Sequence, residues 1–159
     1  MIRIADKCDI DIIAELRTEQ QIEDWNFTSS DKDYSAYADE FFILTKDYLS
    51  ENLNSNIYFA IMLIGEIPVA MCAIQTLILL PQITACEVLN AKAGEVVSVY
   101  TRKEYRGKGY QQKLLRVLLE FAKKQCFNEL VLTTNTLDAQ HIYRKLGFNY
   151  ISNKYYYKF

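Results

Sequence analysis

The stretch YRGKGYQQKLL, residues 105–115, is the part of this chain that says most about its fold. It places two glycines and three basic residues at the start of a predicted helix, although the whole chain carries a net charge of −2. A predicted strand, EVVSVYT (95–101), comes just before it. The first backbone N–H groups of a helix have no partner within the helix, and the helix dipole adds partial positive charge there. The order strand, glycine loop, helix therefore predicts a site for phosphate oxygens, with Arg106 and Lys108 adding charge.

Two familiar phosphate-binding loops do not fit this stretch. A Walker A loop needs G-x-x-x-x-G-K-[ST], and no such run occurs. A dinucleotide fingerprint needs G-x-G-x-x-G, and after Gly107 and Gly109 the third glycine is missing. The pattern therefore argues against a nucleotide hydrolase and against a nicotinamide enzyme. A solvated basic helix face is the alternative that the charge alone leaves open.

The rest of the chain predicts one mixed α/β domain over residues 1–159. Strands are expected at 2–4, 57–64, 67–80, 95–101 and 130–133, and helices at 9–23, from caps at 29–31 to about 53, 111–124 and 138–146. Residues 81–94 are expected to form a loop, and 150–159 one or two closing strands. The apolar run LVLT (130–133) is typical of a strand buried on both faces in a parallel pair.

Composition excludes several classes of function. No apolar run reaches the roughly 18 residues that span a bilayer, and the N-terminus has no apolar signal segment, which predicts a cytosolic protein without a membrane partner. The four cysteines form no CxxC pair and are expected to be reduced thiols, most of them buried. With one histidine and no metal-ligand spacing, no metal site is expected. A pI of about 5.5 argues against nucleic-acid binding.

A second motif, IYRKLGF (142–148), lies near the C-terminus. The two motifs together resemble the GNAT acetyltransferase superfamily, in which a strand is followed by Arg/Gln-x-x-Gly-x-Gly/Ala and a helix, and a Y-x-K-L-G-F segment is common further on. Arg106-Gly-Lys-Gly109-Tyr-Gln111 matches the first pattern. The resemblance covers nearly the whole chain and is strongest over 95–148. It implies a mixed α/β fold with a central, mostly antiparallel twisted sheet, splayed between its fourth and fifth strands and flanked by about four helices.

The resemblance also implies acetyl-CoA as the co-substrate. The pantetheine would pair with the backbone of residues 99–101, where the backbone could polarise the thioester carbonyl, and the pyrophosphate would take N–H groups from 106–111. Asn135 would contact the pantetheine arm or, alternatively, cap the following helix. Gln111 stands where the family has glycine or alanine, so its side chain must point away from the pyrophosphate. The cofactor-binding residues implied are Val99, Tyr100, Thr101, Arg106, Gly107, Lys108, Gly109, Tyr110, Gln111 and Asn135.

The reaction that the resemblance implies is attack by a neutral amine on the acetyl thioester. Tyr143 is the candidate proton donor to the leaving thiolate, because a phenol with a reference pKa near 10 stays protonated at neutral pH. The helix pattern alone would place Tyr143 in the core. Glu95, four residues before Val99, is the candidate general base, with a solvent-facing strand end as the alternative; Ser98 could order a water instead. His141 is expected to be an exposed helix residue.

The acceptor half of the site in this family comes from the first two helices and the loop at 81–94. Residues 1–60 hold 13 acids and 5 bases. This charge favours a cationic amine as acceptor, a small molecule such as a polyamine or the lysine or N-terminus of a peptide, although it could also serve solubility. A second hypothesis is a GNAT-fold module that binds CoA without turnover. The aromatic tail NKYYYKF could form an exposed edge strand that pairs with a second copy in a homodimer.

Overall fold

A computed structural model describes residues 1–28, 33–83, 85–89, 91–134 and 137–150. In chain order its elements are β1 (Ile2–Ile4), the 3-10 helix η1 (Lys7–Asp9), α1 (Ile10–Thr28), η2 (Tyr34–Tyr37), α2 (Ala38–Asn52), β2 (Ile57–Ile64), β3 (Ile67–Leu77), β4 (Gln82–Ile83), β5 (Val88–Leu89), β6 (Ala93–Thr101), η3 (Lys103–Tyr105), α3 (Tyr110–Lys124), β7 (Glu129–Val131) and α4 (Leu137–Lys145). The predicted helix caps at 29–31 and the tail at 151–159 lie outside these ranges.

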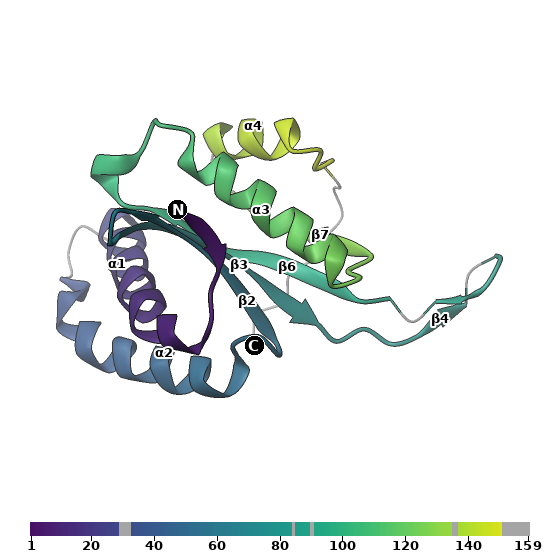
Figure 1. Ribbon diagram of the computed structural model, residues 1–159, viewed down its shortest axis with the longest axis horizontal. Coiled ribbons are helices and arrows are strands. Elements are labelled where there is room, and N and C mark those ends of the chain that lie inside the picture. Colours follow the sequence, from purple (N-terminus) through teal and green to yellow (C-terminus); the bar gives the residue numbers. More distant parts are fainter. Residues whose placement is uncertain (29–32, 84, 90, 135–136, 151–159) are drawn as a thin grey trace.

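Five strands form one sheet in the order β1-β2-β3-β6-β7. The first four pair antiparallel, and β7 runs parallel to β6. α1 and α2 cover one face of the sheet, and α3 and α4 cover the other (Figure 1). This arrangement confirms the mixed α/β, mostly antiparallel fold predicted from the sequence.

β6 and β7 separate soon after they meet. β7 pairs only with the start of β6, from Ala93 to Glu95. Beyond Glu95, β6 continues to Thr101 with no strand on that side in the described part of the chain. The expected splay between the fourth and fifth strands of the sheet is therefore present. The strand predicted at 130–133 is wrong in its bounds, since β7 runs from Glu129 to Val131. Its predicted burial on both faces is also wrong, because β7 is the last strand described in the sheet and its residues are half-buried or exposed.

A β-bulge interrupts β6 inside this opening. The register of β6 against β3 shifts between Met71 and Ala73, so that Cys72 faces both Ser98 and Val99. Ser98 has a φ of +55°, in the left-handed region that residues other than glycine rarely adopt. A bulge leaves the backbone of its extra residue out of the ladder. Backbone groups of β6 thus become available for a ligand at the position where the sequence predicts the thioester contact.

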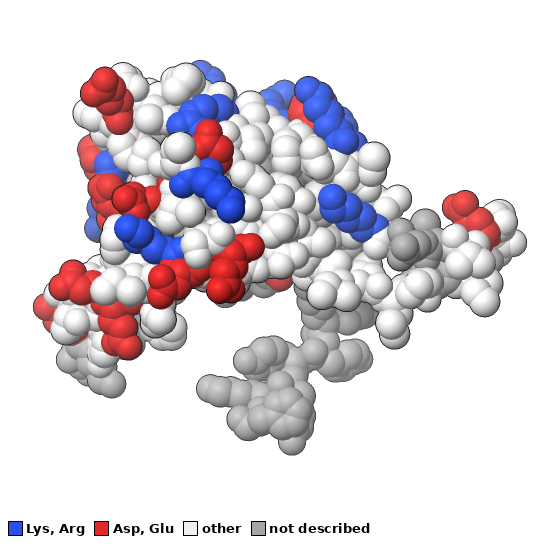
Figure 2. Space-filling model, turned by 60° about the horizontal axis from the view of Figure 1, so that its bottom comes forward, with Lys and Arg blue, Asp and Glu red and all other residues white. Residues whose placement is uncertain are grey.

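The segment between β3 and β6 is an arm and not the predicted loop. β3 ends at Leu77, β4 and β5 pair with each other, and β6 begins at Ala93. The arm extends away from the sheet at the right of Figure 1, and its surface in Figure 2 is mostly uncharged. Ile78 and Ile83 are exposed on it. Its place in the acceptor half of the site stays a prediction.

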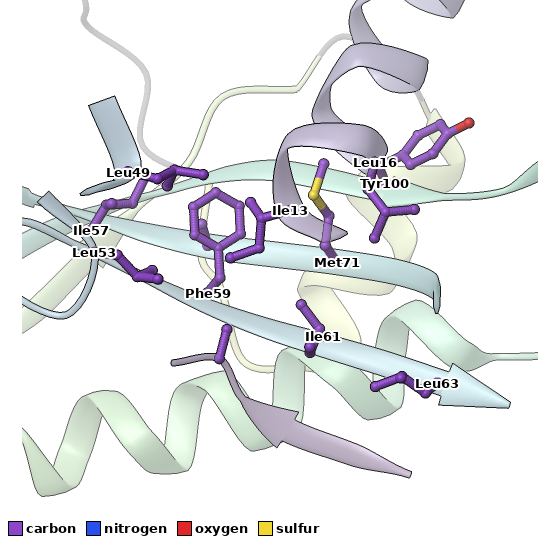
Figure 3. Packing of buried hydrophobic residues seen from close by; sticks show 12 residues of the cluster. Ile13, Leu16, Leu49, Leu53, Ile57, Phe59, Ile61, Leu63, Met71 and Tyr100 are labelled. Atoms are coloured by element: carbon purple, nitrogen blue, oxygen red, sulfur yellow. The ribbon is translucent and has the colours of Figure 1, made fainter. Parts of the chain in front are cut away.

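Two hydrophobic clusters lie on opposite faces of the sheet. Figure 3 shows the cluster beneath α1 and α2, whose members include Ile13, Leu16, Leu49, Phe59, Ile61 and Met71. The other cluster lies beneath α3 and α4 and includes Ala70, Cys72, Ile74, Leu114, Leu115, Leu118 and Tyr143. Successive side chains of a strand point to opposite faces, so Met71 enters the first cluster and Cys72 the second. The sheet is thus covered on both sides. Burying each large apolar side chain stabilises the fold by about 1.5–3 kcal/mol.

Several predictions of burial can be compared with the structure. Of the four cysteines only Cys72 is buried, so the expectation that most of them are buried is wrong. Burial raises the pKa of the Cys72 thiol. His141 is exposed, as predicted. In the described part of the chain, no helix has the length and apolarity to cross a membrane, and no three His, Cys, Asp or Glu side chains are grouped to hold a metal ion.

Asp9 is a buried carboxylate that joins β1 to the start of α1. The residue is only 2% exposed. Its two oxygens accept hydrogen bonds from the Arg3 guanidinium, one of them at 2.6 Å, and one also accepts from the Asp6 backbone N–H at 2.9 Å. Burial acts to raise the pKa of Asp9, but the hydrogen bonds from Arg3 and Asp6 outweigh it and hold the pKa below its usual range.

We expect Asp9→Asn to lower the free energy of unfolding at pH 7 by about 2 kcal/mol, since a hydrogen bond to a charged group contributes about 1.5–3 kcal/mol. The depressed pKa makes this contribution present above the unfolded-state pKa of about 4 and lost as pH falls through the folded pKa. Urea unfolding at neutral and acidic pH measures the difference from wild type, which should shrink in acid. Asp11→Asn, which removes an exposed ion pair with Lys46, is the control. An equal difference at both pH values would contradict the prediction.

Candidate functional site

The glycine loop is open to solvent where the sequence predicts phosphate binding. Gly107 and Gly109 have φ values of +74° and +70°, in the left-handed region that favours glycine. A Cβ atom built on either would meet no atom within 4 Å. Gly109 is the N-cap of α3, and no side chain caps this end of the helix. The N–H groups of the first turn are therefore left for water or for a ligand.

The Gln111 side chain turns away from this loop and toward the sheet. Its amide Nε2 donates to the Met71 carbonyl of β3 at 3.1 Å, and its Oε1 accepts from the Thr101 hydroxyl of β6 at 3.2 Å. Both bonds lie next to the bulge, where the register between β3 and β6 shifts. The amide therefore connects the first turn of α3 to two strands, and the space above the loop stays clear.

We expect Gln111→Ala to lower the free energy of unfolding by about 1 kcal/mol, because it leaves the Met71 carbonyl without its partner. The affinity for acetyl-CoA should change by no more than about twofold, since the side chain does not face the loop. Thermal unfolding and calorimetric titration measure the two quantities. Gln112→Ala is the control, because Gln112 makes no side-chain hydrogen bond within the part of the chain that the structure describes. A tenfold loss of acetyl-CoA affinity in the Gln111 variant would contradict this account.

The two basic side chains of the loop already have partners. Arg106 Nη2 lies 2.7 Å from a carboxylate oxygen of Glu23 on α1, its Nε donates to the Thr101 carbonyl at 2.8 Å, and its guanidinium lies over the Tyr100 ring. Lys108 Nζ donates to a backbone carbonyl of η3 at 3.2 Å. Both residues are exposed. Arg106 therefore connects the loop to α1, a contact that the sequence does not predict.

A cleft of about 1270 Å³ lies beside Arg106, between the end of α1, the end of β6 and η3. In this part of the molecule, at the left of Figure 2, acidic and basic side chains alternate. The charged residues that line the cleft are Glu19, Glu23, Asp24, Arg102, Lys103, Glu104 and Arg106. Carboxylates thus outnumber cations in the lining by one. Because Arg106 belongs to the lining, the cleft lies next to the predicted cofactor loop.

Arg102 lines this cleft and joins β6 to α1, a role that the sequence analysis did not predict. Its guanidinium contacts Glu15 at 2.5 Å and Glu19 at 2.6 Å on α1, and its Nη1 donates to the Pro68 carbonyl at 2.8 Å. The hydrogen bonds that Arg102 donates to Glu19 are the main reason that the pKa of Arg102 is raised. Glu15 and Glu19 stand four residues apart, a spacing that places both on one face of a helix. That spacing was the available signal for a shared cationic partner.

Two other groups of the cleft have shifted pKa values. Burial, with the neighbouring Glu23 charge, raises the pKa of Asp24. Burial, followed by the charges of Glu19 and Glu23, raises the pKa of Tyr100 to about 12. The Tyr100 phenol therefore stays protonated and donates to Glu23 at 3.3 Å. Glu23 is held from two sides, by Tyr100 and by Arg106.

Tyr143 lies on the α3–α4 face, close to the bulge. The residue is 8% exposed, and its ring packs edge-on against Phe148 with 5.9 Å between the ring centres. Burial, then the nearby Cys72, raises its pKa. Cys72 belongs to the same cluster and faces the bulge. The ring is thus part of the core, while the phenol makes no hydrogen bond within the described ranges, so it can still act as a proton donor.

Glu95 lies on the other face of the sheet from Tyr143. It shares the α1–α2 face with Val97, two residues on, and is half-buried. Its cross-strand neighbour Gln75 accepts a hydrogen bond from the Tyr48 hydroxyl of α2 at 3.0 Å. The structure therefore does not bring the candidate base and the candidate acid into contact. Asn135, which the resemblance implies as a contact of the pantetheine arm, lies outside the described residues.

The comparisons with known proteins point to one family. The model of the acetyltransferase (GNAT) family matches residues 12–148. The human N-acetyltransferase 8B is 36% identical over 62 residues, which are 38% of this chain and 27% of that protein. The match thus spans about a quarter of the relative's length.

Solved structures share the fold over the whole chain. A predicted acetyltransferase from Clostridium acetobutylicum, crystallised with acetyl-CoA, superposes with a TM-score of 0.74 at 21% identity, covering 99% of this chain and 95% of that one. A transcriptional regulator from Bacillus halodurans C-125 has a TM-score of 0.69 at 19% identity, covering 100% and 99%. At such identities the likeness concerns the fold.

Proposed function

Since the chain belongs to the GNAT acetyltransferase family, we propose that it transfers an acetyl group from acetyl-CoA to a primary amine. Residues 1–159 would form one catalytic domain. The Clostridium neighbour with acetyl-CoA and the human N-acetyltransferase, which matches only in part, both support this choice of donor and acceptor.

One observation carries the proposal: an open glycine loop at the start of α3 lies beside the opening between β6 and β7. The loop offers uncapped N–H groups at the positive end of a helix dipole, which suit a pyrophosphate. Gly107 and Gly109 leave space above the backbone, and Gln111 turns its side chain away from that space. The residues present therefore fit the phosphate end of acetyl-CoA.

Acetyl-CoA would supply an activated acyl group as a thioester, and the chain would supply orientation, polarisation and proton transfer. Backbone N–H groups near the bulge at Ser98 and Val99 would stabilise negative charge on the carbonyl oxygen. The Tyr143 phenol is protonated at neutral pH, and burial raises its pKa further, so it would give its proton to the leaving sulfur. Glu95 would accept the proton of the amine from the other face, directly or through water.

The acceptor in this proposal is an amine with a second cationic group. The cleft at the end of α1 supports this choice, because its lining contains more carboxylates than cations. The reacting amine itself must be neutral to attack, so the second group is the one that the carboxylates would bind. Polyamines and lysine-containing peptides belong to this class of acceptor. A screen in which only amines without a second cationic group are acetylated would contradict it.

Calorimetric titration with acetyl-CoA and an assay of CoA release with a mixed amine pool test the proposal together. We expect binding in the micromolar range, and CoA release that depends on the amine. No binding would overturn the proposal. Binding without amine-dependent release would instead support a module that binds CoA without turnover.

A further inference from the structure

Glu23 holds the basic side chain that a bound pyrophosphate would need. Both of its carboxylate oxygens lie within hydrogen-bond reach of Arg106 Nη2, at 2.7 and 2.8 Å. The Arg106 Nη1 group makes no hydrogen bond within the described residues and can meet a second anion. The two side chains are partly exposed, 44% for Arg106 and 23% for Glu23. An ion pair this exposed is weak, so an anion with two or more charges can displace the carboxylate.

We propose that Glu23 exchanges Arg106 for the second cationic group of the acceptor when acetyl-CoA binds. In the free protein Arg106 neutralises Glu23. In the complex Arg106 turns to the pyrophosphate, and the carboxylate of Glu23 is released into the cleft, where it binds the acceptor. This inference rests on the proposed function and assigns a specificity-determining role to Glu23.

The neighbours of Glu23 explain why it would bind a cation once released. Tyr100 donates to one of its oxygens and remains in place, because its ring is packed in the α1–α2 cluster. Asp24 is adjacent, and burial, followed by the neighbouring Glu23 charge, raises its pKa. Arg102 cannot move across to compensate, because Glu15, Glu19 and the Pro68 carbonyl hold it. Removal of Arg106 thus leaves a fixed carboxylate beside a second one.

The exchange also couples the binding of the acceptor to the binding of acetyl-CoA. Before acetyl-CoA binds, a cationic acceptor must compete with Arg106 for Glu23. After acetyl-CoA binds, that competitor is engaged elsewhere, so the affinity for the acceptor rises. By linkage the acceptor raises the affinity for the cofactor by the same factor.

The first test is calorimetric titration of the wild type, Glu23→Gln and Glu120→Gln with CoA. Glu120→Gln is a matched control, because it removes an exposed ion pair with Lys123 on α3, away from the cleft. We expect Glu23→Gln to bind CoA about two- to fivefold more tightly than the other two proteins, because no ion pair must be broken first. Equal or weaker binding by Glu23→Gln overturns the exchange. Absence of CoA binding in all three proteins overturns the proposed function instead.

The second test compares polyamine binding with and without the cofactor, and its first arm uses the unmodified protein. Spermidine is titrated into the wild type with and without saturating CoA. We expect tighter spermidine binding in the presence of CoA, and loss of this difference in Glu23→Gln. Equal spermidine binding in both conditions, while CoA binds normally, would show that Arg106 does not release Glu23 for the acceptor.

Discussion

Tyr143→Phe is expected to lower kcat for acetyl transfer by about 10²-fold or more, because general acid catalysis typically contributes 10²–10⁴-fold. The variant removes only the phenolic hydroxyl, which makes no hydrogen bond to the described residues. The ring that packs against Phe148 and within the α3–α4 cluster is retained. We therefore expect the KM for acetyl-CoA and the melting temperature to stay close to those of the wild type. Steady-state CoA release with an excess of amine measures the effect.

Tyr58→Phe is the matched control for this prediction. Tyr58 is buried to the same degree, at 9% exposure, but its hydroxyl donates to the Ser55 carbonyl, away from the bulge. Its loss should cost stability and leave kcat unchanged. If the two variants had the same kcat, Tyr143 would be a core residue only. Because burial raises the pKa of Tyr143, the alkaline loss of activity in the wild type should begin above the ordinary tyrosine value of about 10.

Gly109→Val is expected to weaken acetyl-CoA binding by about 10²-fold. The left-handed backbone at Gly109 disfavours a β-branched residue, and a side chain there would occupy the open space above the first turn of α3. Loss of two hydrogen bonds to a charged phosphate at about 1.5 kcal/mol each corresponds to this factor. Calorimetric titration measures the change.

Gly65→Val separates backbone strain from blocked binding. Gly65 lies in the turn between β2 and β3 with a φ of +61°, and a Cβ atom there would also meet nothing within 4 Å. Both variants should therefore lose a similar amount of stability, about 1–2 kcal/mol. Only the Gly109 variant should lose affinity for acetyl-CoA. Unchanged affinity in Gly109→Val would place the pyrophosphate elsewhere.

The fold could be predicted from the sequence where a pattern is local. The hairpin of β2 and β3 follows from apolar runs on both sides of Gly65-Glu66, and α3 and α4 follow from helical spacing of apolar residues. The run from 95 to 115 predicted a strand, a glycine loop and a helix in that order. The predicted cytosolic location, the acceptor and the homodimer stay predictions.

The misses have a common physical reason: they depend on contacts between segments far apart in the chain. The ion pairs of Arg102 and Arg106 with α1 join residues more than 80 positions apart, so no local pattern contains them. The bulge at Ser98 arises from the register between β3 and β6, which a single strand does not encode. The arm at 78–92 has weak patterns, because each of its strands is two residues long. The half-buried state of β7 follows from its place in the sheet.

The two hydrophobic clusters on opposite faces of the sheet also affect how such a chain can evolve. They share no residues, and the sheet separates them. Substitutions without shared partners have nearly additive effects on stability. A change beneath α1 and α2, the face of the cleft, can therefore alter the choice of acceptor without repacking the face of α3. Descendants of one ancestor could in this way acquire new substrates by drift on one face while the donor stays the same.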